Sequence, residues 1–349
     1  MPATITVATQ SSTPASRTSA DFVGDGINDQ NAINAALDSL ANGGCVYLCE
    51  GTYRIRSNGN AFKGGVVIKN SNILLTGAGA STRLMLDANQ NVNVIRIWGD
   101  NTRNVTIRDI YINGARDTNS TSNFETCGIR GSSVVPPNNP QRNITVDSCL
   151  IEECYSLNVF LWGTGVFVRN CRLGNATSDI GELLGGPGAF TDNYVEVSAT
   201  SGYGLGSDQA SNIRISNNTV RVTSTGRITQ ALFRTWGGRY RNVIDANQVY
   251  VEPGGVVRMF FETSGYLNII SNNSISGQQA TPELGIPRGC IRVNGGTVLS
   301  ANLFQNIDFV GADTSGGWPI SLVNNYFFYS SIVSKPNNTM MLGNVFFPQ

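Results

Sequence analysis

Carboxylate and guanidinium side chains concentrate in a few short apolar segments in the second half of the chain. These segments read IGELLGG (180–186), YGLGSD (203–208), ALFRTWGGR (231–239), VVRMFFET (256–263) and CIRVN (290–294). Paired carboxylates can act as acid and base, or as acid and nucleophile, in glycosidic bond cleavage. Arginine forks bind sugar hydroxyls, and an aromatic side chain offers a platform for a sugar ring. The residue types therefore point to carbohydrate chemistry.

We assign candidate catalytic roles to Glu182, Asp208 and Glu262, and candidate substrate-binding roles to Arg234, Trp236, Arg258, Arg292, Trp162 and Tyr203. Carboxylates one or two strands apart, with strands about 4.8 Å apart, have a separation that suits glycoside hydrolysis or transfer. An arginine beside carboxylates would instead suit a lyase, which removes a proton next to a uronate carboxyl. An Arg–Glu pair on adjacent strands is also an ordinary cross-strand ion pair, so the same residues fit a surface that only binds.

A six-residue phrase repeats through the second half of the chain and sets the positions of these segments. Its copies read VDSCLI, VRNCRL, FTDNYV, ISNNTV, IDANQV, ISNNSI, LSANLF, LVNNYF and MLGNVF. The fourth positions are Cys149, Cys171, Asn193, Asn218, Asn247, Asn273, Asn302, Asn325 and Asn344, at intervals of 19 to 29 residues. A fixed phrase at a loose period indicates a solenoid. Each copy predicts two short strands that meet at a polar corner, with the asparagine amides hydrogen-bonded from turn to turn.

Strand alternation predicts which side chains of VVRMFFET face outward. Arg258, Phe260 and Glu262 fall on one face, and Met259 and Phe261 fall on the other, which we take as the core. The outward residues of successive turns would then line a groove along the solenoid.

Counting back from the repeated phrase predicts which residues stand level on neighbouring turns. Trp236 and Glu262 both lie 11 residues before their asparagine, and by the same count Arg234 stands level with Phe260. This alignment predicts a cluster in which Trp236 and Arg234 lie beside Glu262.

Composition narrows the function classes. The net charge is zero, with 24 basic and 24 acidic residues, so nucleic acid and an anionic membrane are not expected partners. The chain has no histidine, which excludes Ser-His and Cys-His nucleophile systems and His-ligated zinc. The seven cysteines leave at least one unpaired, and we expect Cys149 and Cys171, and likewise Cys45 and Cys49, to be small buried side chains rather than metal ligands or disulfides. We expect no cofactor and no metal; calcium stays open, although no dense aspartate loop is present.

The N-terminal part predicts a cap for the solenoid. Residues 28–41 have apolar side chains at helical spacing, with Asp25 or Asn28 as the candidate N-cap and a Gly-Gly stop. A helix over the first turn would cover an open sheet edge. We therefore expect an N-terminal extension over residues 1–20 and a single domain over 21–349, with one long loop insertion over 115–142 that carries Arg116, Asp117, Glu125 and Arg130.

The segment DFVGDGINDQNAINAALDSLANGGCVYLCEGTYRI resembles the N-terminal signature of the pectate-lyase-like right-handed parallel β-helix superfamily. The resemblance implies an all-β chain, a right-handed parallel β-helix of about ten turns with an N-terminal amphipathic helix cap. The middle of the chain is also similar to the inulin fructotransferases through CGIRG, IGELLGG and GCIRVNGGTVLSANLF. Polygalacturonase-like enzymes need Gly-His-Gly and Arg-Ile-Lys, and mannuronan epimerases need Asp-Pro-x-His; this chain has none of these motifs.

The resemblance implies a protein that binds a polysaccharide or oligosaccharide and cleaves it as a glycosidase, transferase or lyase. The alternative is a non-catalytic adhesin, phage spike or structural surface protein. We expect an extracellular or virion-surface location, although no signal peptide is visible. An uncovered last turn predicts a homo-oligomer, with a trimer preferred by analogy.

Overall fold

The computed structural model describes residues 3–57, 59, 64–120, 126–131, 140–237, 241–278, 288–294, 296–311, 319–335 and 337–347. The chain folds into two compact units, Met1–Ser178 and Asp179–Gln349. Both units consist of short parallel strands, so the predicted solenoid of short strands is confirmed. The expectation of a single domain over residues 21–349 stays a prediction.

The elements of the first unit are β1 (Thr4–Ala8), α1 (Pro14–Ser19), β2 (Phe22–Val23), α2 (Gln30–Ser39), β3 (Gly44–Leu48), β4 (Gly51–Ile55), β5 (Gly64–Ile68), β6 (Ile73–Leu86), β7 (Asn93–Ile97), β8 (Arg103–Asn113), η1 (Arg116–Thr118), β9 (Ile129–Arg130), β10 (Gln141–Asp147), β11 (Leu150–Glu152), β12 (Leu157–Arg169) and β13 (Arg172–Leu173).

The elements of the second unit are β14 (Asp179–Gly185), β15 (Gly188–Thr191), β16 (Tyr194–Val197), β17 (Thr200–Ser201), β18 (Tyr203–Asp208), β19 (Ile213–Ser216), β20 (Thr219–Val222), β21 (Arg227–Trp236), β22 (Val243–Asp245), β23 (Gln248–Val251), β24 (Val256–Thr263), β25 (Asn268–Ser271), β26 (Ser274–Ser276), β27 (Gly289–Val293), β28 (Thr297–Ser300), β29 (Leu303–Gln305), β30 (Ile307–Gly311), β31 (Ser321–Val323), β32 (Tyr326–Phe328), β33 (Ile332–Ser334), β34 (Met340–Leu342) and β35 (Val345–Phe347).

Helix α2 covers apolar strands at the start of the first unit, as the sequence predicts. Its side chains Ile33, Ala36 and Leu37 are buried. Asn34 pairs with β5, because its Nδ2 donates to the carbonyl of Gly65 and its Oδ1 accepts from the amide of Val67, both at 2.8 Å. The helix therefore satisfies backbone groups of β5 as well as burying apolar surface.

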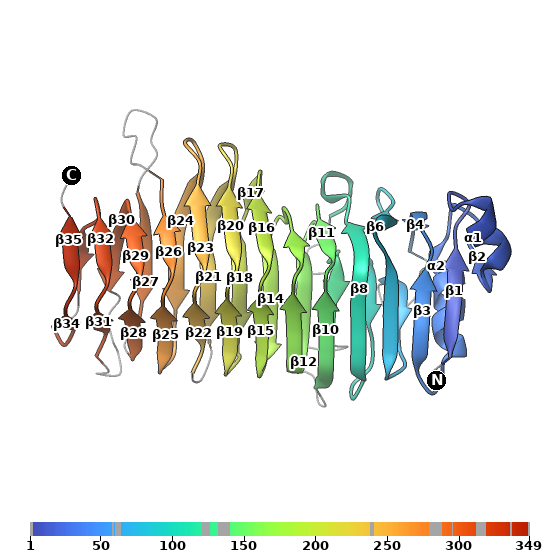
Figure 1. Ribbon diagram of the computed structural model, residues 1–349, viewed down its shortest axis with the longest axis horizontal. Coiled ribbons are helices and arrows are strands. Elements are labelled where there is room, and N and C mark those ends of the chain that lie inside the picture. The colour runs from blue at the N-terminus through green and yellow to red at the C-terminus, as the bar shows by residue number, and fades with distance from the viewer. Residues whose placement is uncertain are drawn as a thin grey trace. The chain divides into compact units, whose positions relative to one another are not determined.

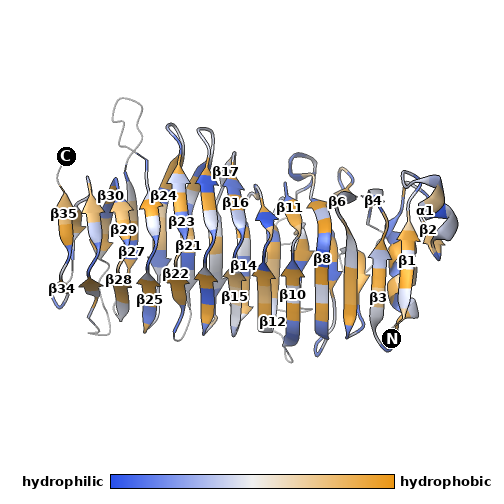
Figure 2. Ribbon diagram, viewed as in Figure 1, coloured by the Kyte–Doolittle hydropathy of each residue, from blue (hydrophilic) through white to orange (hydrophobic). Residues whose placement is uncertain are grey.

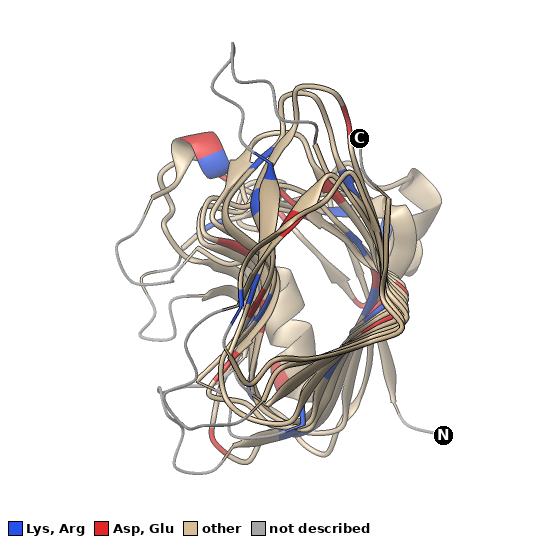
Figure 3. Cartoon of the chain, turned by 90° about the vertical axis from the view of Figure 1, so that its left-hand side faces the viewer, with Lys and Arg blue, Asp and Glu red and all other residues tan. Residues whose placement is uncertain are grey.

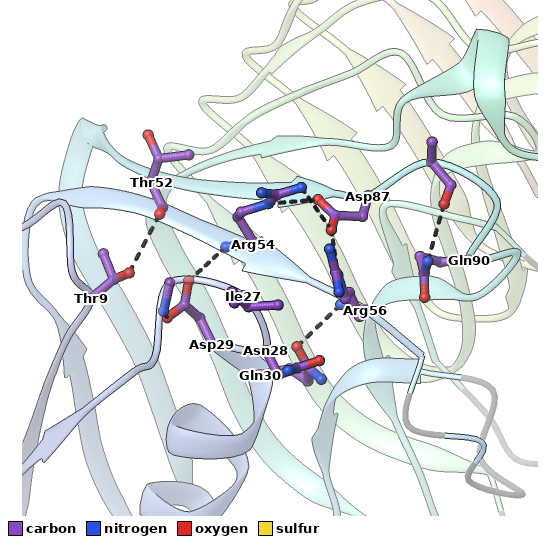
Figure 4. Close-up of polar contacts among 12 residues, drawn as sticks. Thr9, Ile27, Asn28, Asp29, Gln30, Thr52, Arg54, Arg56, Asp87 and Gln90 are labelled. Carbon is purple, nitrogen blue, oxygen red and sulfur yellow. Dashed lines mark hydrogen bonds and ion pairs between the residues drawn. The ribbon is translucent and has the colours of Figure 1, made fainter.

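The N-cap of α2 is Asp29, so the expectation of Asp25 or Asn28 was wrong. The Asp29 carboxylate does not cap the helix; it accepts hydrogen bonds from the amides of Gly26 (2.9 Å) and Arg54 (2.8 Å) (Figure 4). Asp25 instead accepts from the amide of Ile27 at 2.8 Å and so closes the preceding turn. The acidic residues of the N-terminal signature therefore have structural roles.

Two arginines of the first unit converge on one carboxylate. Arg54 and Arg56 both pair with Asp87, and Gln30 of α2 accepts from the amide of Arg56 at 3.1 Å (Figure 4). These contacts tie the helix to the strands that follow it. Residues 1–20, which we expected as an extension, contribute β1, and β1 pairs in parallel with β3.

The segment 115–142 is not one long loop in its described parts. It contains η1 and the buried strand β9, which pairs with β7 and β12. Arg130 lies on β9 and is buried over the ring of Phe160, with its Cζ 5.3 Å from the ring centre. Arg116 pairs with Glu153 at 3.2 Å, and Glu125 lies outside the described residues. The repeated phrase did not predict β9, because this two-residue strand is not directly followed by a copy of the phrase.

Three parallel sheets run through the second unit, and each turn of the chain contributes strands to all of them (Figure 1). Sheet 1 contains β14, β18, β21, β24, β27, β30 and β33. Sheet 2 contains β15, β19, β22, β25, β28, β31 and β34. Sheet 3 contains β16, β20, β23, β26, β29, β32 and β35.

The core between these sheets is built from the apolar positions of the repeated phrase. Hydrophobic and hydrophilic bands alternate along the strands (Figure 2). Phe304 and Phe327, from successive turns, are fully buried with their ring centres 5.4 Å apart. Because identical positions stack on one another, each turn buries its apolar side chains against its neighbours.

The asparagines of the repeat form the predicted hydrogen-bonded ladder in the second unit. The Nδ2 of Asn218 donates to the Oδ1 of Asn247, and the Nδ2 of Asn247 donates to the Oδ1 of Asn273, both at 2.9 Å. The same pattern continues to Asn302, Asn325 and Asn344. Each Oδ1 also accepts from the backbone amide of the preceding asparagine, so the ladder fixes one turn against the next.

The left-handed residue of each corner is the one before the ladder asparagine. Asn217, Ala246 and Asn272 have φ between 54° and 56°, whereas Asn218 and Asn247 are buried and do not adopt this conformation. In the first unit Cys149 and Cys171 occupy ladder positions and are buried, and none of the seven cysteines, all of them described, forms a disulfide. The prediction of small buried side chains is confirmed for Cys49, Cys149 and Cys171, whereas Cys45 is only partly buried.

Replacing one ladder asparagine tests this arrangement. We expect Asn247→Ala to lower the free energy of unfolding by about 3 kcal/mol, because it leaves buried donors of Asn218 and the carbonyl of Ile215 without partners. Urea titration measures the effect. The control is Gln248→Ala, whose side chain is exposed on the adjacent position and should change stability by less than about 0.5 kcal/mol. Equal effects of the two substitutions would contradict a stabilising ladder.

Candidate functional site

Sheet 1 brings the predicted charged residues of the second unit onto neighbouring strands. In the strand register Glu182 stands opposite Gly206, and Gly206 stands opposite Arg234. Arg234 in turn stands opposite Glu262, and Glu262 stands opposite Arg292. Asp208 stands level with Leu184 and Trp236, two residues further along the same strands. Figure 3, turned by 90° from Figure 1, shows how acidic and basic residues are distributed over the strands. We call Glu182, Tyr203, Asp208, Arg234, Trp236, Glu262 and Arg292 the sheet 1 cluster.

The predicted alignment of Trp236 with Glu262 was wrong by two residues. Arg234, not Trp236, stands opposite Glu262. The connection between β21 and β22 is longer than that between β24 and β25, so equal distances from the asparagines do not mean equal heights on sheet 1. The ladder asparagines stay in register although the loops between strands differ in length from turn to turn. Counting residues back from an asparagine therefore does not give the position of a residue on sheet 1.

Arg234 occupies the centre of the cluster. Its Cζ lies 4.4 Å from the ring centre of Tyr203 and 5.4 Å from that of Trp236, so the guanidinium contacts two aromatic faces. Its Nε lies 3.9 Å from the Oε2 of Glu262. The Trp236 side chain is 41% exposed, which leaves an indole surface open to a ligand.

Glu262 lies between two arginines. It is 7% exposed, and besides the contact with Arg234 its Oε1 lies 3.8 Å from the NH1 of Arg292. Arg292 is the more open partner, with 54% of its side chain exposed. The carboxylate therefore orients both guanidinium groups, and Arg292 keeps donors available for a ligand.

Glu182 is the most perturbed carboxyl group of the cluster. It is 8% exposed, and burial is the main reason that its pKa rises from the ordinary 4.5 to about 8. The negative charges of Asp179 and Asp208 raise the pKa further, and the positive charge of Arg234 lowers it. Glu182 is therefore a protonated carboxylic acid at neutral pH, which is the state required of a proton donor.

The hydroxyl of Tyr203 experiences the charges of residues on three other strands of the second unit. Burial raises the pKa of its hydroxyl, Arg234 lowers it, and Glu262, Asp179 and Glu182 raise it. The phenol on β18 thus lies within electrostatic reach of carboxyl groups from β14 and β24. Asp179 was missed in the sequence; its only signal was its position three residues before Glu182.

Two predicted residues do not join the cluster. Arg258 is exposed four residues before Glu262 on β24, and its carbonyl lies near the thiol of Cys290. Trp162 belongs to the first unit, where it is buried at 7% exposure.

The predicted faces of β24 are correct for Met259 and Phe261, which are buried, but Phe260 is buried as well. An irregularity in the pairing of β24 with β27 falls at this point, and the ring packs against the small residue Gly289. Strict alternation did not predict this because the irregularity carries no sequence signal.

A hollow in the second unit lies away from the cluster. It has a volume of about 300 Å³ and is lined by residues 250–255, 276–278, 305 and 306. The groove expected over sheet 1 therefore stays a prediction. Within the described residues no group of three or more acidic or cysteine side chains is placed to hold a metal ion. No helix there is long and apolar enough to cross a membrane.

Comparison with solved structures defines the fold class. The tailspike protein of the Escherichia coli bacteriophage HK620, solved in complex with a pentasaccharide, superposes with a TM-score of 0.66 at 16% identity, over 96% of this chain and 65% of the tailspike. The DFA-IIIase of Arthrobacter chlorophenolicus A6 superposes with a TM-score of 0.55 at 14% identity, over 88% of this chain and 85% of the enzyme. The chain therefore has the right-handed parallel β-helix fold, and the fold that the sequence resemblance implied is confirmed.

The curated proteins with sequence similarity to this chain are named as mannuronan C5-epimerases and an alginate lyase. Mannuronan C5-epimerase AlgE4 of Azotobacter vinelandii is 35% identical over 106 residues, or 28% of this chain, and alginate lyase 7 of the same organism is 33% identical over 138 residues, or 37%. The matches span 19% and 16% of those proteins. No family model matches the chain. The chain is thus similar in fold, and over part of its sequence, to β-helix proteins that are named for activities on carbohydrates.

The protonation state of Glu182 predicts a pH dependence of stability. Its folded pKa of about 8 lies above the ordinary 4.5, so between these values the unfolded chain releases a proton that the folded protein keeps. The stabilisation is complete below pH 4.5 and is lost as the pH rises through about 8. Glu182→Gln mimics the protonated acid and should therefore remove this loss of stability. We expect the difference in unfolding free energy between the variant and the wild type to grow in favour of the variant from pH 4.5 to about 8.

Urea titrations at a series of pH values measure this difference. The matched control is Glu196→Gln on β16, a surface carboxylate paired with Arg221 at 3.4 Å. Parallel pH curves for the wild type and Glu182→Gln would contradict a buried protonated Glu182.

Proposed function

We propose that the second unit binds a polysaccharide across the sheet 1 cluster and cleaves a glycosidic bond, with Glu182 as the general acid. The observation that carries the proposal is the placement of a nearly buried glutamic acid beside the carboxylates of Asp179 and Asp208. One protonated acid next to further carboxyl groups is the arrangement that glycosidases use, because one group must donate a proton while another acts as base or nucleophile.

Asp208 is the proposed partner of Glu182. It lies on the adjacent strand and two residues further along, which places the two Cα atoms roughly 8 Å apart given strand spacing and rise. Glu182 would protonate the departing glycosidic oxygen, and Asp208 would activate the attacking water or attack the sugar carbon. A sugar hydroxyl in place of the water would give transfer instead of hydrolysis.

The rest of the cluster supplies binding groups. Trp236 offers an exposed ring for the apolar face of a sugar, and Arg234 lies over a face of the same ring, with its Cζ 5.4 Å from the ring centre. Arg292 reaches solvent and can donate to sugar hydroxyls. Glu262, which we expected as a third catalytic candidate, is better explained as the residue that positions both arginines, since it lies within 4 Å of each.

The relatives support a carbohydrate ligand for this chain. The tailspike was solved with a pentasaccharide, and the curated relatives are named as an alginate lyase and mannuronan epimerases. A lyase reaction is the main competitor within the enzyme class, and it requires a uronate substrate. Glu182 favours cleavage by protonation, because a protonated carboxylic acid cannot remove a proton from the substrate.

A second candidate function is glycan binding without cleavage, as in an adhesin or spike. Two observations favour it: Glu262 is engaged by arginines, and the described hollow lies outside the cluster. The same exposed Trp236 and Arg292 would then serve binding alone.

An extracellular or virion-surface location and a homo-oligomer, with a trimer preferred, remain proposals. The strands β33 to β35 expose apolar side chains, including Val333, Met340 and Leu342 at 60% or more. A further layer of β structure or another subunit would cover them.

Substitutions in the cluster test the proposed reaction. We expect Glu182→Gln to lower kcat/KM by about a hundredfold or more and Asp208→Asn to have a comparable effect, because each removes one half of the acid–base pair. Trp236→Ala should mainly raise KM. In the wild type, kcat/KM should fall as the pH rises through about 8, where Glu182 loses its proton. Glu196→Gln, outside the cluster, should retain full activity.

The assay uses a panel of alginate, polygalacturonate, inulin, dextran and bacterial O-antigen polysaccharides. New reducing ends indicate hydrolysis, and the ultraviolet absorbance of an unsaturated uronate indicates elimination. Full activity of Glu182→Gln would refute the assigned acid. Binding without any new product across the panel would favour the second candidate.

A further inference from the structure

The hollow in the second unit lies on the outer side of sheet 3 and is separate from the cluster. Tyr250, Ser276 and Gln305 stand level on β23, β26 and β29, which lie side by side (Figure 1). The turn 251–255 and residues 277, 278 and 306 complete its lining. Glu262 lies near the other end of β24, roughly 20 Å from this turn by strand rise. A ligand in the hollow would therefore not contact the cluster.

The shape of the hollow suits a small ligand. Its volume of about 300 Å³ is at the lower end of the range for ligand sites. Tyr250 is 53% exposed, so its ring presents a face to the solvent at the edge of the hollow. A flat aromatic surface beside a shallow depression can stack on the apolar face of one sugar ring.

The polar groups around the hollow are amides and hydroxyls. The hydroxyl of Ser276 donates to the Oε1 of Gln305 at 3.4 Å, which leaves the Gln305 amide nitrogen to donate to a ligand. The side chain of Gln278 is fixed by two hydrogen bonds to Val257. Its Nε2 donates to the Val257 carbonyl at 2.9 Å, and its Oε1 accepts from the Val257 amide at 3.4 Å. Neutral donors and acceptors of this kind match the hydroxyls of a sugar.

The charges around the hollow disfavour an anionic ligand. Among the described residues, its lining includes Glu252 and no lysine or arginine. Arg221 stands level with Tyr250 and is held by Glu196 and Glu252. Arg227 stands level with Val256, and its NH1 donates to the carbonyls of Ser224 and Gly226. A uronate, sulfate or phosphate would find no lysine or arginine among the described lining residues to bind it.

We propose that this hollow is a second carbohydrate-binding site, which holds one neutral sugar residue on Tyr250 and Gln305. It is independent of the sheet 1 cluster and does not require that cluster to be catalytic. A site of this kind would let the protein hold a glycan chain at two places on the same unit, so that the effective concentration of the chain near the cluster rises.

The test measures binding of methyl glycosides of glucose, galactose, mannose, N-acetylglucosamine, fructose and glucuronate by saturation-transfer NMR and calorimetry. The protein carries Trp236→Ala, so that binding at the cluster is weakened. We expect at least one neutral glycoside to bind, Tyr250→Ala to weaken it about tenfold or more, and Tyr250→Phe to retain most of the affinity because the ring face is kept. Methyl glucuronide should bind at least tenfold more weakly.

The matched control is Tyr326→Ala, which removes a tyrosine of similar exposure (48%) on β32, outside the hollow. It should leave binding unchanged. The proposal is overturned if no neutral glycoside binds, if Tyr250→Ala binds as well as its parent, if Tyr326→Ala causes the same loss, or if glucuronide binds as tightly as the neutral sugars. Loss of activity in the cluster variants would leave these results unchanged, so the two proposals fail separately.

Discussion

The asparagine ladder holds successive turns of the second unit in register, and every functional feature of that unit depends on this constraint. Each amide accepts a backbone N–H and donates to the next amide and to a carbonyl, so a buried polar group becomes a fixed spacer between turns. A slip of one residue would turn outward side chains inward. Glu182, Arg234, Glu262 and Arg292 stand on sheet 1 in consecutive order because the ladder prevents such a slip.

The fixed stack also accounts for the electrostatics of the cluster. Parallel strands place like and unlike charges at a spacing of about 4.8 Å whether or not the charges attract. Glu262 falls between two arginines, whereas Glu182 falls near two other carboxyl groups and is almost buried. The same architecture thus produces a paired carboxylate and a protonated acid on one face, and this difference is what acid–base chemistry requires.

The sequence predicted the fold well because each turn of the fold contains a copy of the same repeated phrase. The phrase around Asn247 predicted the corner, the ladder and the buried flanks, and the apolar spacing of residues 28–41 predicted α2 within two residues at each end. It also predicted that Arg234 and Glu262 lie together on neighbouring strands, which the pairing of β21 with β24 confirms, whereas their functional roles stay predictions. The heights of Trp236 and Glu262 were wrong because loop lengths vary outside the repeat. The protonation of Glu182 and the hollow beside Tyr250 depend on burial and turn shape, which no residue pattern encodes.

The titration of Glu182 in the folded wild-type protein tests the central claim most directly. Carbon-13 NMR of selectively labelled glutamate carboxyl groups, assigned with Glu182→Gln, reports the protonation of this side chain at each pH. The account predicts a midpoint near pH 8, set by burial and by the neighbouring charges of Asp179 and Asp208. A midpoint near the ordinary value of 4.5 would show that Glu182 is solvated and ionised, and it would contradict its role as the proton donor of the cluster.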